Sequence, residues 1–458
     1  MIGLAAAYAL RRRGCAVTVV EAGRPGGAAS HGNAGWIVPS LSGPVPAPGL
    51  ARTSARWMLR PGNPLYVRPR ADPAFLRWLL TFWRRCNARD YRAGLEAVAE
   101  LNRRTMALFD AYRADGVAFE GYADGLVFAY LEPHEMERDI RGLELLRPFG
   151  YDAPALLDGA AIRDLEPALT DAVVGGYHVP QERHVRPDSL ITGLVDRLEA
   201  DGVTLLAETP VVGIAHRDGR VTAVETPRGW VAADAIVVCA GAWTPAVLRL
   251  AGVRRIPIEA GKGYSLDYAP PPALPEAIRR PLYLHEARVA VTPLQVMVRL
   301  AGTMELSGLN GRIPPARIAA IARVGTRYLR GWPPDPHVAT PWTGMRPMTP
   351  DGLPVIGPVP GFANLLVASG HAMLGLTLAP ATAEALADLL TTDQPPALLR
   401  PFDPSRFGRD HGIGGGRQAA GGGDQRSLRY VMTRPTGTRR AVAPLMFRSY
   451  AVAGGGRV

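Results

Sequence analysis

The chain begins with Met1-Ile2-Gly3-Leu4-Ala5-Ala6-Ala7-Tyr8-Ala9-Leu10-Arg11-Arg12-Arg13-Gly14, followed by Cys15-Ala16-Val17-Thr18-Val19-Val20-Glu21. The alanine-rich first part predicts a helix, because alanine has the highest helix propensity. Its three arginines suit the C-terminal end, where cations meet the negative end of the helix dipole, and Gly14 provides a C-cap. The second part is a short, β-branched apolar run, which predicts a strand with the acid Glu21 at its carboxyl end.

Helix, strand and acid together match the second half of a Rossmann βαβ unit. Gly3 takes the place of the last glycine of G-x-G-x-x-G, and Glu21, eighteen residues further on, is the acid that binds a ribose hydroxyl pair. The first strand and the first two glycines do not precede it. Because that strand is central in a doubly wound sheet, we expect a gap between its two neighbours. Our hypothesis is that Met1 lies inside a truncated motif, which the sequence encoded upstream would test; the alternative is a true N-terminus on a degenerate protein.

Composition is that of an ordinary globular protein, with 47% hydrophobic and 20% charged residues in a chain of 458, long enough for two or three domains. No run of about 20 uninterrupted apolar residues predicts a membrane span. The first arginines follow the apolar stretch instead of preceding it, unlike a signal peptide. Cys15, Cys86 and Cys239 are odd in number and widely spaced, which argues against a disulfide framework and a thiolate metal site. We therefore predict a cytoplasmic protein without a metal.

The net charge of +11 is concentrated at one end of the chain. Residues 408–458 hold nine arginines against two aspartates, a net charge of +7, which leaves +4 for residues 1–407. Lys262 is the only lysine, and such a skew towards arginine is more typical of coding bias than of selection for phosphate contacts. We expect no nucleic-acid partner.

A long loop and several helices follow the first strand. Residues 26–49 are rich in glycine, serine and proline, and a loop of this length in a compact domain is usually functional. Residues 73–115 carry an apolar stripe at helical spacing, which favours a helix with one face in the core. Further helices are predicted over 133–147, 187–201 and 313–329.

Short strands dominate the rest of the chain. The run 235–239 is continuously apolar, as expected of a strand buried on both faces, and leads into the small-residue turn 240–244. A second such turn, 369–377, opens a helix that ends at Leu390. The other predicted strands are 203–206, 211–215, 221–226, 231–233, 353–356 and 365–368, with more in 282–306. The glycine- and arginine-rich residues 408–458 are expected to be disordered, or a translated frame without a folded role.

Five separated blocks, in one order along the chain, resemble the flavin-dependent D-amino-acid dehydrogenase/oxidase family, which includes glycine and sarcosine oxidases. The likeness is greatest to the D-amino-acid dehydrogenase small subunits and covers residues 1 to about 407. Five ordered blocks are far more specific than half a Rossmann unit alone. They are the helix and strand that end at Glu21, and residues 30–49, 236–244, 342–357 and 369–380.

The resemblance implies FAD as the cofactor and assigns residues to it. Small residues in the first loop let the backbone come within contact distance of a planar ring. Glu21 would accept hydrogen bonds from the adenosine ribose, and the backbone of Val212 would pair with adenine. The complete implied set is Gly3, Glu21, Ser30, His31, Gly32, Asn33, Ala34, Gly35, Val212, Ala240, Gly241, Trp243, Gly370, His371, Met373, Gly375 and Thr377.

The resemblance also implies a role for the helix that follows residues 370–377. In the family its N-terminus points at the N1/C2 carbonyl edge of the flavin, where negative charge collects on reduction. A positive dipole end there favours acceptance of a hydride. His371 is equally compatible with a structural role in this turn.

Substrate binding is assigned by the resemblance to Arg346, within Trp342-Thr343-Gly344-Met345-Arg346-Pro347. A guanidinium binds a carboxylate in two-pronged fashion, whereas an ammonium does not; the alternative is a structural ion pair. Glycine oxidases add a tyrosine where residues 288–292 have none, which favours the dehydrogenase side and leaves the second carboxylate contact open. Lys262 lies at the crossover into the substrate domain, and its position is compatible both with packing and with a place near the ring.

No nucleophile, metal cluster or dedicated general base is evident, which fits direct hydride transfer from Cα to flavin N5. We therefore predict oxidative deamination of a D-amino acid, or of a relative such as D-hydroxyproline, with electrons passed to a quinone or another carrier. A glycine- or sarcosine-type oxidase that uses oxygen is one alternative. A non-catalytic, truncated remnant unable to bind FAD is the other.

The predicted fold is α/β: a Rossmann-like FAD-binding domain that lacks its first strand, interleaved with an α+β substrate domain built on an antiparallel sheet. The FAD-binding domain is expected to take residues 1–50, 165–258 and 343–407. The substrate domain takes 51–164 and 259–342. The cytoplasmic location includes peripheral contact with the inner face of the membrane as a further expectation.

Overall fold

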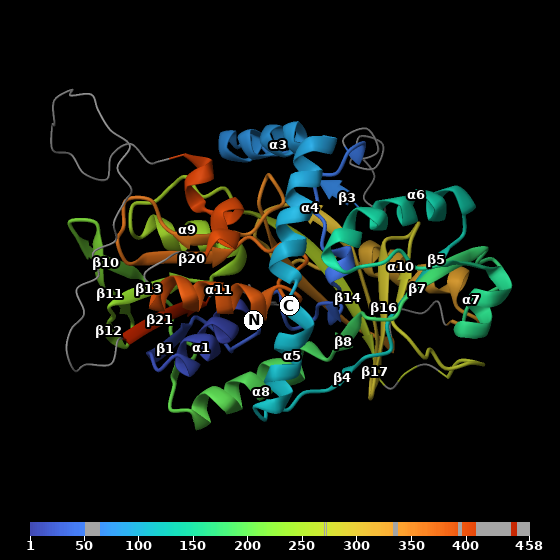
Figure 1. The fold of residues 1–458 in the computed structure, drawn as a ribbon, viewed down its shortest axis with the longest axis horizontal. Helices are drawn as coiled ribbons and strands as arrows, with labels where there is room; N and C mark the ends of the chain where they lie inside the picture. Colours follow the sequence, from blue (N-terminus) through green and yellow to red (C-terminus); the bar gives the residue numbers. More distant parts are fainter. Residues whose placement is uncertain are drawn as a thin grey trace, which may run out of the picture.

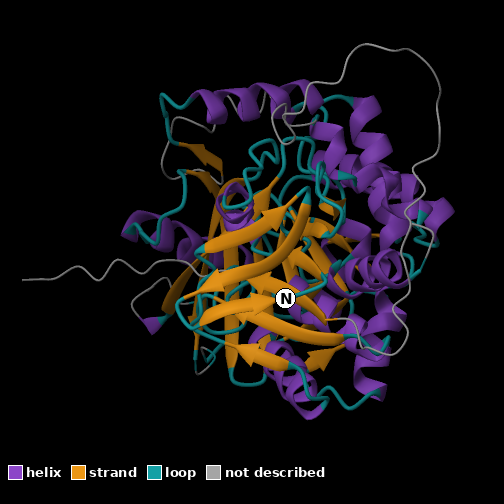
Figure 2. Ribbon diagram, turned by 90° about the vertical axis from the view of Figure 1, so that its left-hand side faces the viewer, coloured by secondary structure: helices purple, strands orange, loops and turns teal. Residues whose placement is uncertain are grey.

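The computed structural model describes residues 1–50, 65–269, 271, 273–332, 338–392 and 396–408 in full, and the backbone of 441–446. Two large sheets dominate these residues, one in each half of the molecule as drawn in Figure 1. Figure 2 shows their strands running through the interior, with the helices along the outside. This confirms the predicted α/β class with two sheet-based parts.

The first sheet is built mainly from parallel strands. Only its edge strand β19 is antiparallel to its neighbour. In order across the sheet, the strands are β19 (Val355–Pro358), β20 (Leu365–Ser369), β13 (Ala235–Val238), β21 (Ala441–Met446), β1 (Ala16–Glu21) and β9 (Thr204–Leu206). Such an open parallel sheet places the carboxyl ends of its strands at one edge, where doubly wound folds bind their ligands.

Both faces of this sheet are covered. One face packs against α1 (Ile2–Arg12), α8 (Pro187–Ala200) and α11 (Ala379–Thr391), whose apolar side chains share a core with Val19 and Val237. The other face packs against a meander and α9, around Val20 and Ile236. These elements are β10 (Gly213–Arg217), β11 (Arg220–Thr226), β12 (Gly229–Ala232) and α9 (Thr244–Arg249). Coverage on both faces explains why residues 235–238 form a continuous apolar run.

The gap expected beside β1 is not open, because β21 lies there. This strand pairs in parallel with β1 on one side and with β13 on the other. Residues 441–446 are therefore a strand, which corrects the prediction that they belong to a disordered tail; residues 409–440 and 447–458 lie outside the described residues. The backbone groups of the buried strands β1 and β13 need hydrogen-bond partners between them. This requirement outweighs the weak strand signal in the sequence of residues 441–446.

The second sheet is mostly antiparallel. In order, its strands are β18 (Thr340–Met348), β14 (Glu259–Tyr268), β17 (Met297–Leu306), β16 (Val289–Leu294), β15 (Leu282–Leu284), β5 (Leu126–Tyr130), β7 (Gly175–Val179) and β6 (Leu156–Asp158), and β3 (Leu65–Val67) pairs with β17. Helix α10 (Pro315–Tyr328) packs on one face through Ile318 and Ile321. The opposite face meets the loop after β1.

The remaining elements lie around these two sheets. The helix predicted over 73–115 is three helices, because Asn87 caps a new helix after Cys86 and the chain turns again at Arg103 and Arg104. They are α3 (Pro73–Arg85), α4 (Ala88–Asn102) and α5 (Thr105–Ala114), and the other helices are α6 (Pro133–Leu143) and α7 (Gly159–Leu165). A small sheet joins β2 (Trp36–Ile37), β8 (Arg183–Val185) and β4 (Gly121–Tyr122). Short 3-10 turns are η1 (Pro39–Leu41), η2 (Glu144–Phe149), η3 (Gly241–Trp243), η5 (Ala397–Phe402) and η6 (Pro404–Phe407).

Strand pairing differs from the predicted domain limits at two places. The limit at 342/343 falls inside β18, all of which pairs with β14. Strand β7, placed by prediction in the FAD-binding part, pairs with β5 and β6 of the second sheet. Residues 51–64 of the predicted substrate domain lie outside the described residues. Within the described residues, no helix is both long and apolar enough to cross a bilayer.

Candidate active site

The floor of the candidate site is the face of the second sheet that lies opposite α10. In the β14–β18 ladder, Gly261 faces Arg346, Gly263 faces Gly344 and Ser265 faces Trp342. Directly opposed residues of an antiparallel pair project to the same side, and so do alternate residues along each strand. Arg346, Trp342 and Ser265 therefore share one face with three glycines.

The glycines leave room for the two large side chains of this face. A Cβ on Gly263 would lie 2.4 Å from the guanidinium of Arg346, and one on Gly344 would lie 2.1 Å from the ring of Trp342. The guanidinium and the ring thus lie directly over bare backbone. Ser265 is fully buried beside them, and its Oγ has no hydrogen-bond partner among the described residues.

Arg346 is held by backbone and not by a carboxylate. Its Nη1 donates to the carbonyl oxygen of Thr303 at 2.7 Å, and no acid of the described residues forms an ion pair with it. Burial lowers the pKa of this guanidinium to about 10. A cation without a counter-charge at the bottom of a site is ready to accept an anion.

Two strained backbone positions contact Arg346 or the residue after it. Thr303 has φ +68°, and it lies in a β-bulge where Thr303 and Met304 together face Gly263. Ala372, with φ +47°, donates its N–H to the carbonyl of Pro347 at 2.9 Å. Left-handed conformations of residues other than glycine are costly and cluster at functional sites, and a bulge redirects nearby groups. Here the bulge aims a carbonyl at Arg346.

The loop of residues 30–35 lies against this floor. Asn33 organises it, because its side chain donates to the carbonyl of Ser30 at 3.0 Å and accepts from the N–H of Gly35 at 2.7 Å. Gly35 has φ +76°, and a Cβ there would lie 2.1 Å from the carbonyl oxygen of Val185. A Cβ on Gly32 would lie 2.4 Å from the Trp342 ring.

Polar side chains of the second sheet fix this loop by its backbone. Arg299, which is 1% exposed, pairs with Asp267 at 2.6 Å and donates to the carbonyls of His31 at 3.2 Å and Asn33 at 2.9 Å. Thr292 donates to the carbonyl of Ala34 at 2.7 Å. The exposed imidazole of His31 lies 6.4 Å from the Trp342 ring, centroid to centroid.

The turn before α11 approaches from the first sheet. Gly370 has φ +78°, and His371 next to it is buried, with Nε2 at 3.1 Å from Thr382 Oγ1 and Nδ1 without a partner. Burial lowers the pKa of His371 to about 3, so its ring is neutral. Thr377 joins the turn to the first loop, since its Oγ1 donates to the carbonyl of Trp36 at 3.2 Å and accepts from the N–H of Val38 at 3.1 Å.

Glu21 and the turn 240–243 lie at the carboxyl edge of the first sheet. Glu21 is 5% exposed, and its Oε1 accepts from the N–H of Gly23 at 2.9 Å. Gly241 has φ +53°, and its carbonyl accepts from Ser369 Oγ at 3.0 Å. Ala240 and Trp243 are buried in the same turn. These residues therefore share an edge with the turn before α11.

The other predicted residues are more dispersed. Gly3 is buried in the first turn of α1. Val212 is 51% exposed and its N–H donates to the carbonyl of Glu225 at 2.9 Å, while Met373 is 56% exposed beside Gly375. Lys262 projects from the opposite face of β14, where its Nζ meets Asn310, Glu305 and the carbonyl of Arg312 at 2.8, 3.2 and 2.9 Å. This position places Lys262 in packing and away from the candidate site.

The described residues fit a bound FAD on several counts. The loop 30–35 and the turn at Gly370 are cradles in which a Cβ would collide with neighbouring atoms. Ser265 Oγ, on the same face as Arg346, and His371 Nδ1, in the turn whose backbone pairs with Met348, are buried polar atoms without partners among the described residues. Polar groups in such positions are normally satisfied by a partner, so they mark the interior of a ligand site.

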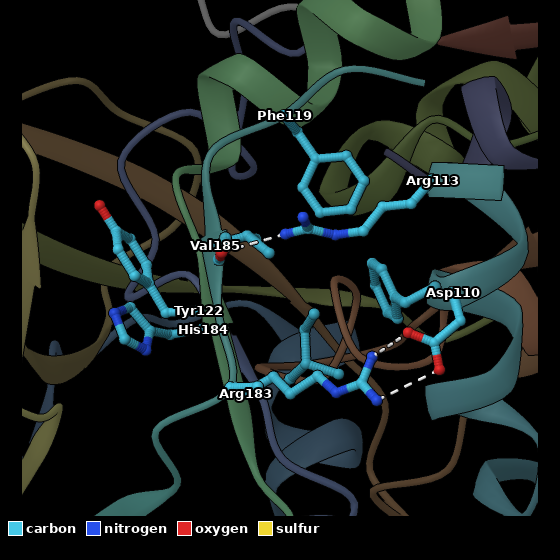
Figure 3. Close-up of a pocket in the computed structure, with 11 residues that line it drawn as sticks. Asp110, Arg113, Phe119, Tyr122, Arg183, His184 and Val185 are labelled. Atoms are coloured by element: carbon cyan, nitrogen blue, oxygen red, sulfur yellow. Dashed lines mark hydrogen bonds and ion pairs between the residues drawn. The ribbon is translucent and has the colours of Figure 1, made fainter. Parts of the chain in front are cut away.

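A cavity of about 240 Å³ between α5 and β8 is a separate feature (Figure 3). Its charged groups are already paired: Arg183 binds Asp110, and Arg113 donates to the carbonyl of Gly121 at 3.0 Å and lies over the Phe119 ring. The described residues contain no cluster of side chains arranged to hold a metal ion. The site is therefore better placed at the Arg346 floor.

Sequence reasoning gave no role of their own to four residues of this site, Ser265, Arg299, Thr303 and Trp342, although Trp342 stands in the block that carries Arg346. The available signal was the spacing of Gly261, Gly263 and Gly344, because glycines at every second position of a strand leave one face bare. The bulge at Thr303 has no such signal in the sequence.

Comparison with known proteins gives a consistent result. The family model described as "FAD dependent oxidoreductase" (DAO) matches residues 1–389. The chain is 34% identical to the D-amino acid dehydrogenase of Cereibacter sphaeroides over 85% of this chain and 89% of that protein. It is also 34% identical to that of Phenylobacterium zucineum over 86% and 93%. Glycine oxidase from Geobacillus kaustophilus shares the fold, with a TM-score of 0.68 at 21% identity over 88% of this chain and 96% of that one. The chain belongs to the DAO family of FAD-dependent oxidoreductases.

Proposed function

We propose that the chain is a D-amino-acid dehydrogenase. The observation that carries the proposal is Arg346, a guanidinium without a carboxylate partner among the described residues, on a floor of glycines that faces the 30–35 loop. Support comes from relatives at 34% identity that are named D-amino acid dehydrogenases. When bound, FAD supplies the acceptor for the hydride that leaves Cα as the amino acid becomes an imino acid.

Arg346 would bind the substrate carboxylate and fix the position of Cα. Its fork offers two parallel N–H donors, and the Thr303 carbonyl holds one nitrogen so that the plane of the fork is set before binding. Trp342 and Ser265 would close the floor around the substrate. The Trp342 ring excludes water on the side of Gly32, and the unpartnered Ser265 Oγ is a candidate for the second polar contact.

The cofactor would be held by segments from both ends of the chain. Glu21 is placed for the adenosine ribose, at the end of β1, and the 30–35 loop and the turn 240–243 for the pyrophosphate and ring. The N–H groups at the start of α11 would face the N1/C2 edge. Gly3, Val212, His371, Met373, Gly375 and Thr377 complete the proposed set.

An oxidase of glycine or sarcosine is the second candidate. No phenol is among the described β16 side chains that project towards the floor, which include Ala290 and Thr292, but Tyr283 of the neighbouring β15 lies opposite Ala290 and projects to the same face. Thr292 is already bound to Ala34 and to the indole N–H of Trp36. Stopped-flow reoxidation by air separates the two candidates, since the reduced flavin of a dehydrogenase should persist.

The proposal is tested by the visible spectrum of the purified, FAD-reconstituted protein. We expect a flavin spectrum that a D-amino acid bleaches without oxygen and that the L-enantiomer leaves unchanged. A panel of D- and L-amino acids, with D-hydroxyproline, would identify the side-chain preference. Faster bleaching by L-amino acids would refute the stereochemistry, and a protein that stays colourless after reconstitution would support the non-catalytic remnant.

The features of helix α3 favour a quinone dissolved in the lipid bilayer as the electron acceptor. Leu76, Leu80 and Trp83 are 53%, 44% and 61% exposed and form one stripe of this helix, which lies at the top of Figure 1. Arg77 and Arg84 are exposed beside the stripe, and α3 contains no acidic residue. An apolar stripe flanked by arginines suits peripheral contact with an anionic bilayer.

Flotation with vesicles tests this contact. We expect the protein to float with phosphatidylglycerol vesicles and to remain behind with pure phosphatidylcholine. The triple variant Leu76→Ser, Leu80→Ser and Trp83→Ser should lose flotation, whereas Trp230→Ser, which removes a 58% exposed tryptophan from β12, should retain it. Equal flotation of both variants would exclude α3 as the contact.

A further inference from the structure

The position of β21 in the first sheet is the starting point. Val442 lies opposite both Val17 and Ala235, and Leu445 lies opposite Val20 and Val238. The neighbouring strands are buried, with 0% exposure at Val20 and Val238. Their N–H and C=O groups on this side face no water, so they need a strand in the slot.

Pro444 makes this strand weaker than an ordinary central one. In β21, Val442 and Leu445 pair with residues of β1, whereas Ala443 and Pro444 between them do not. Proline has no backbone N–H to donate, and it is normally confined to edge strands or bulges. A central strand with a proline in its middle is held by fewer hydrogen bonds and leaves its slot more readily.

The length of chain before β21 permits such exchange. Thirty-two residues, 409–440, join Gly408 at the end of η6 to Ala441. At about 3.3–3.6 Å per residue they can span about 100 Å, more than the slot requires. A tether also keeps the strand at a high effective concentration near its own slot, which favours the strand of the same chain over that of a second copy.

The carboxyl end of β21 lies at the cofactor edge of the sheet. Met446 is opposite Glu21, and Leu445 is opposite Val238, two residues before Ala240. The strand therefore sets the distance between the two segments proposed to hold the ends of the dinucleotide. We propose that residues 441–446 are a detachable strand that the chain supplies to its own cofactor domain, and that FAD retention depends on its being seated.

The test uses the full chain with two pairs of variants. Pro444→Val restores the missing donor, and Pro435→Val makes the same change outside β21; Val442→Pro adds a second proline to β21, and Val431→Pro does so outside it. The first measurement is amide hydrogen exchange in β1 and β13, which needs no cofactor. The second is the dissociation constant of FAD, from the quenching of its fluorescence.

We expect Pro444→Val to slow exchange in β1 and β13 at least tenfold and to tighten FAD binding. Val442→Pro should speed exchange and weaken FAD binding at least tenfold, while both control variants match the parent protein. Unchanged exchange in Pro444→Val overturns the seated strand, even if Val442→Pro does not fold. Altered exchange with unchanged FAD affinity overturns the coupling, and a strand-exchanged dimer in sedimentation overturns donation within one chain. A parent protein that binds no FAD, with exchange changed as expected, would refute the cofactor assignment and leave the strand assignment intact.

Discussion

The half-buried guanidinium of Arg346 is held by the carbonyl of Thr303, a residue in a strained backbone conformation. Arg346→Lys keeps the charge and loses the fork, so a substrate carboxylate keeps one contact of two. We expect KM for the D-amino acid to rise and kcat/KM to fall about 10- to 100-fold, roughly 1.4–3 kcal/mol of transition-state binding. Steady-state kinetics measure this, with Arg104→Lys, an exposed arginine of the described surface, as the control. An unchanged KM would mean that another group holds the carboxylate.

Glu182, between β7 and β8, should make stability depend on pH. It is fully buried, its Oε1 accepts from the N–H of Ser40 at 2.9 Å, and its Oε2 has no partner. Burial raises the pKa of this carboxyl from 4.5 to about 7. Between these two values the folded protein holds a proton that the unfolded chain has lost, so the contribution of Glu182 to the free energy of unfolding falls as pH rises, by at most about 3.4 kcal/mol.

Urea unfolding at pH 4.5, 6 and 7.5 measures this dependence. Glu182→Gln should remove this contribution, because the amide stays neutral at every pH, so the unfolding free energy of the parent minus that of the variant should fall as pH rises. Glu100→Gln, at an exposed position of α4, should leave it unchanged. A difference in unfolding free energy between the parent and Glu182→Gln that stays constant across the window would contradict the assignment.

Strands β14 and β18 depend on glycine at chosen positions. Gly263→Ala places a methyl group 2.4 Å from the Arg346 guanidinium, which must move away from the position set by Thr303. We expect kcat/KM to fall at least tenfold while the protein stays folded. Gly142→Ala is the matched control, because nothing lies within 4 Å of its Cβ; by helix propensity it should stabilise α6 by up to about 1 kcal/mol. Steady-state kinetics of both variants measure kcat/KM, and thermal unfolding shows whether each variant is folded; an unchanged kcat/KM in Gly263→Ala would contradict the prediction.

The elements that sequence predicted best are those whose local pattern agrees with their surroundings. The helix before Gly14, the strand that ends at Glu21 and the buried run 235–238 all formed as expected. Strand β14 was missed because glycine disfavours strands, and β18 contains two prolines. Strand β21 was missed because its local sequence gives little strand signal. It forms a strand because it pairs with β1 and β13, which is a tertiary interaction.

Arg299 links the two sheets, because it lies on the second sheet and binds the backbone of the 30–35 loop, which follows β1 of the first sheet. Arg299→Met leaves the Asp267 carboxylate without its partner and frees the carbonyls of His31 and Asn33. We expect a loss of about 3 kcal/mol in unfolding free energy and weaker FAD binding. The double variant Arg299→Met with Asp267→Leu should recover stability and not FAD affinity. Recovery of both in chemical unfolding and FAD titration would show that the loop needs no anchor.

For the molecule as a whole, the family could be recognised from five ordered blocks, and the structure brings those blocks together. The 30–35 loop contacts Trp342, and Pro347 contacts Ala372 of the turn before α11. The role of each residue at the flavin stays a prediction. The domain limits were less predictable, since an interleaved chain crosses between sheets inside strands such as β18, where composition does not change.

The burial of Lys262 has a practical consequence for labelling. The only lysine of the chain is 1% exposed, with its ammonium enclosed by Glu305 and Asn310. A succinimidyl ester should therefore acylate this side chain slowly in the native protein and rapidly once the second sheet opens. Mass spectrometry of the acylated peptide would then report the opening of one defined region, a single-site probe that lysine-rich proteins do not offer.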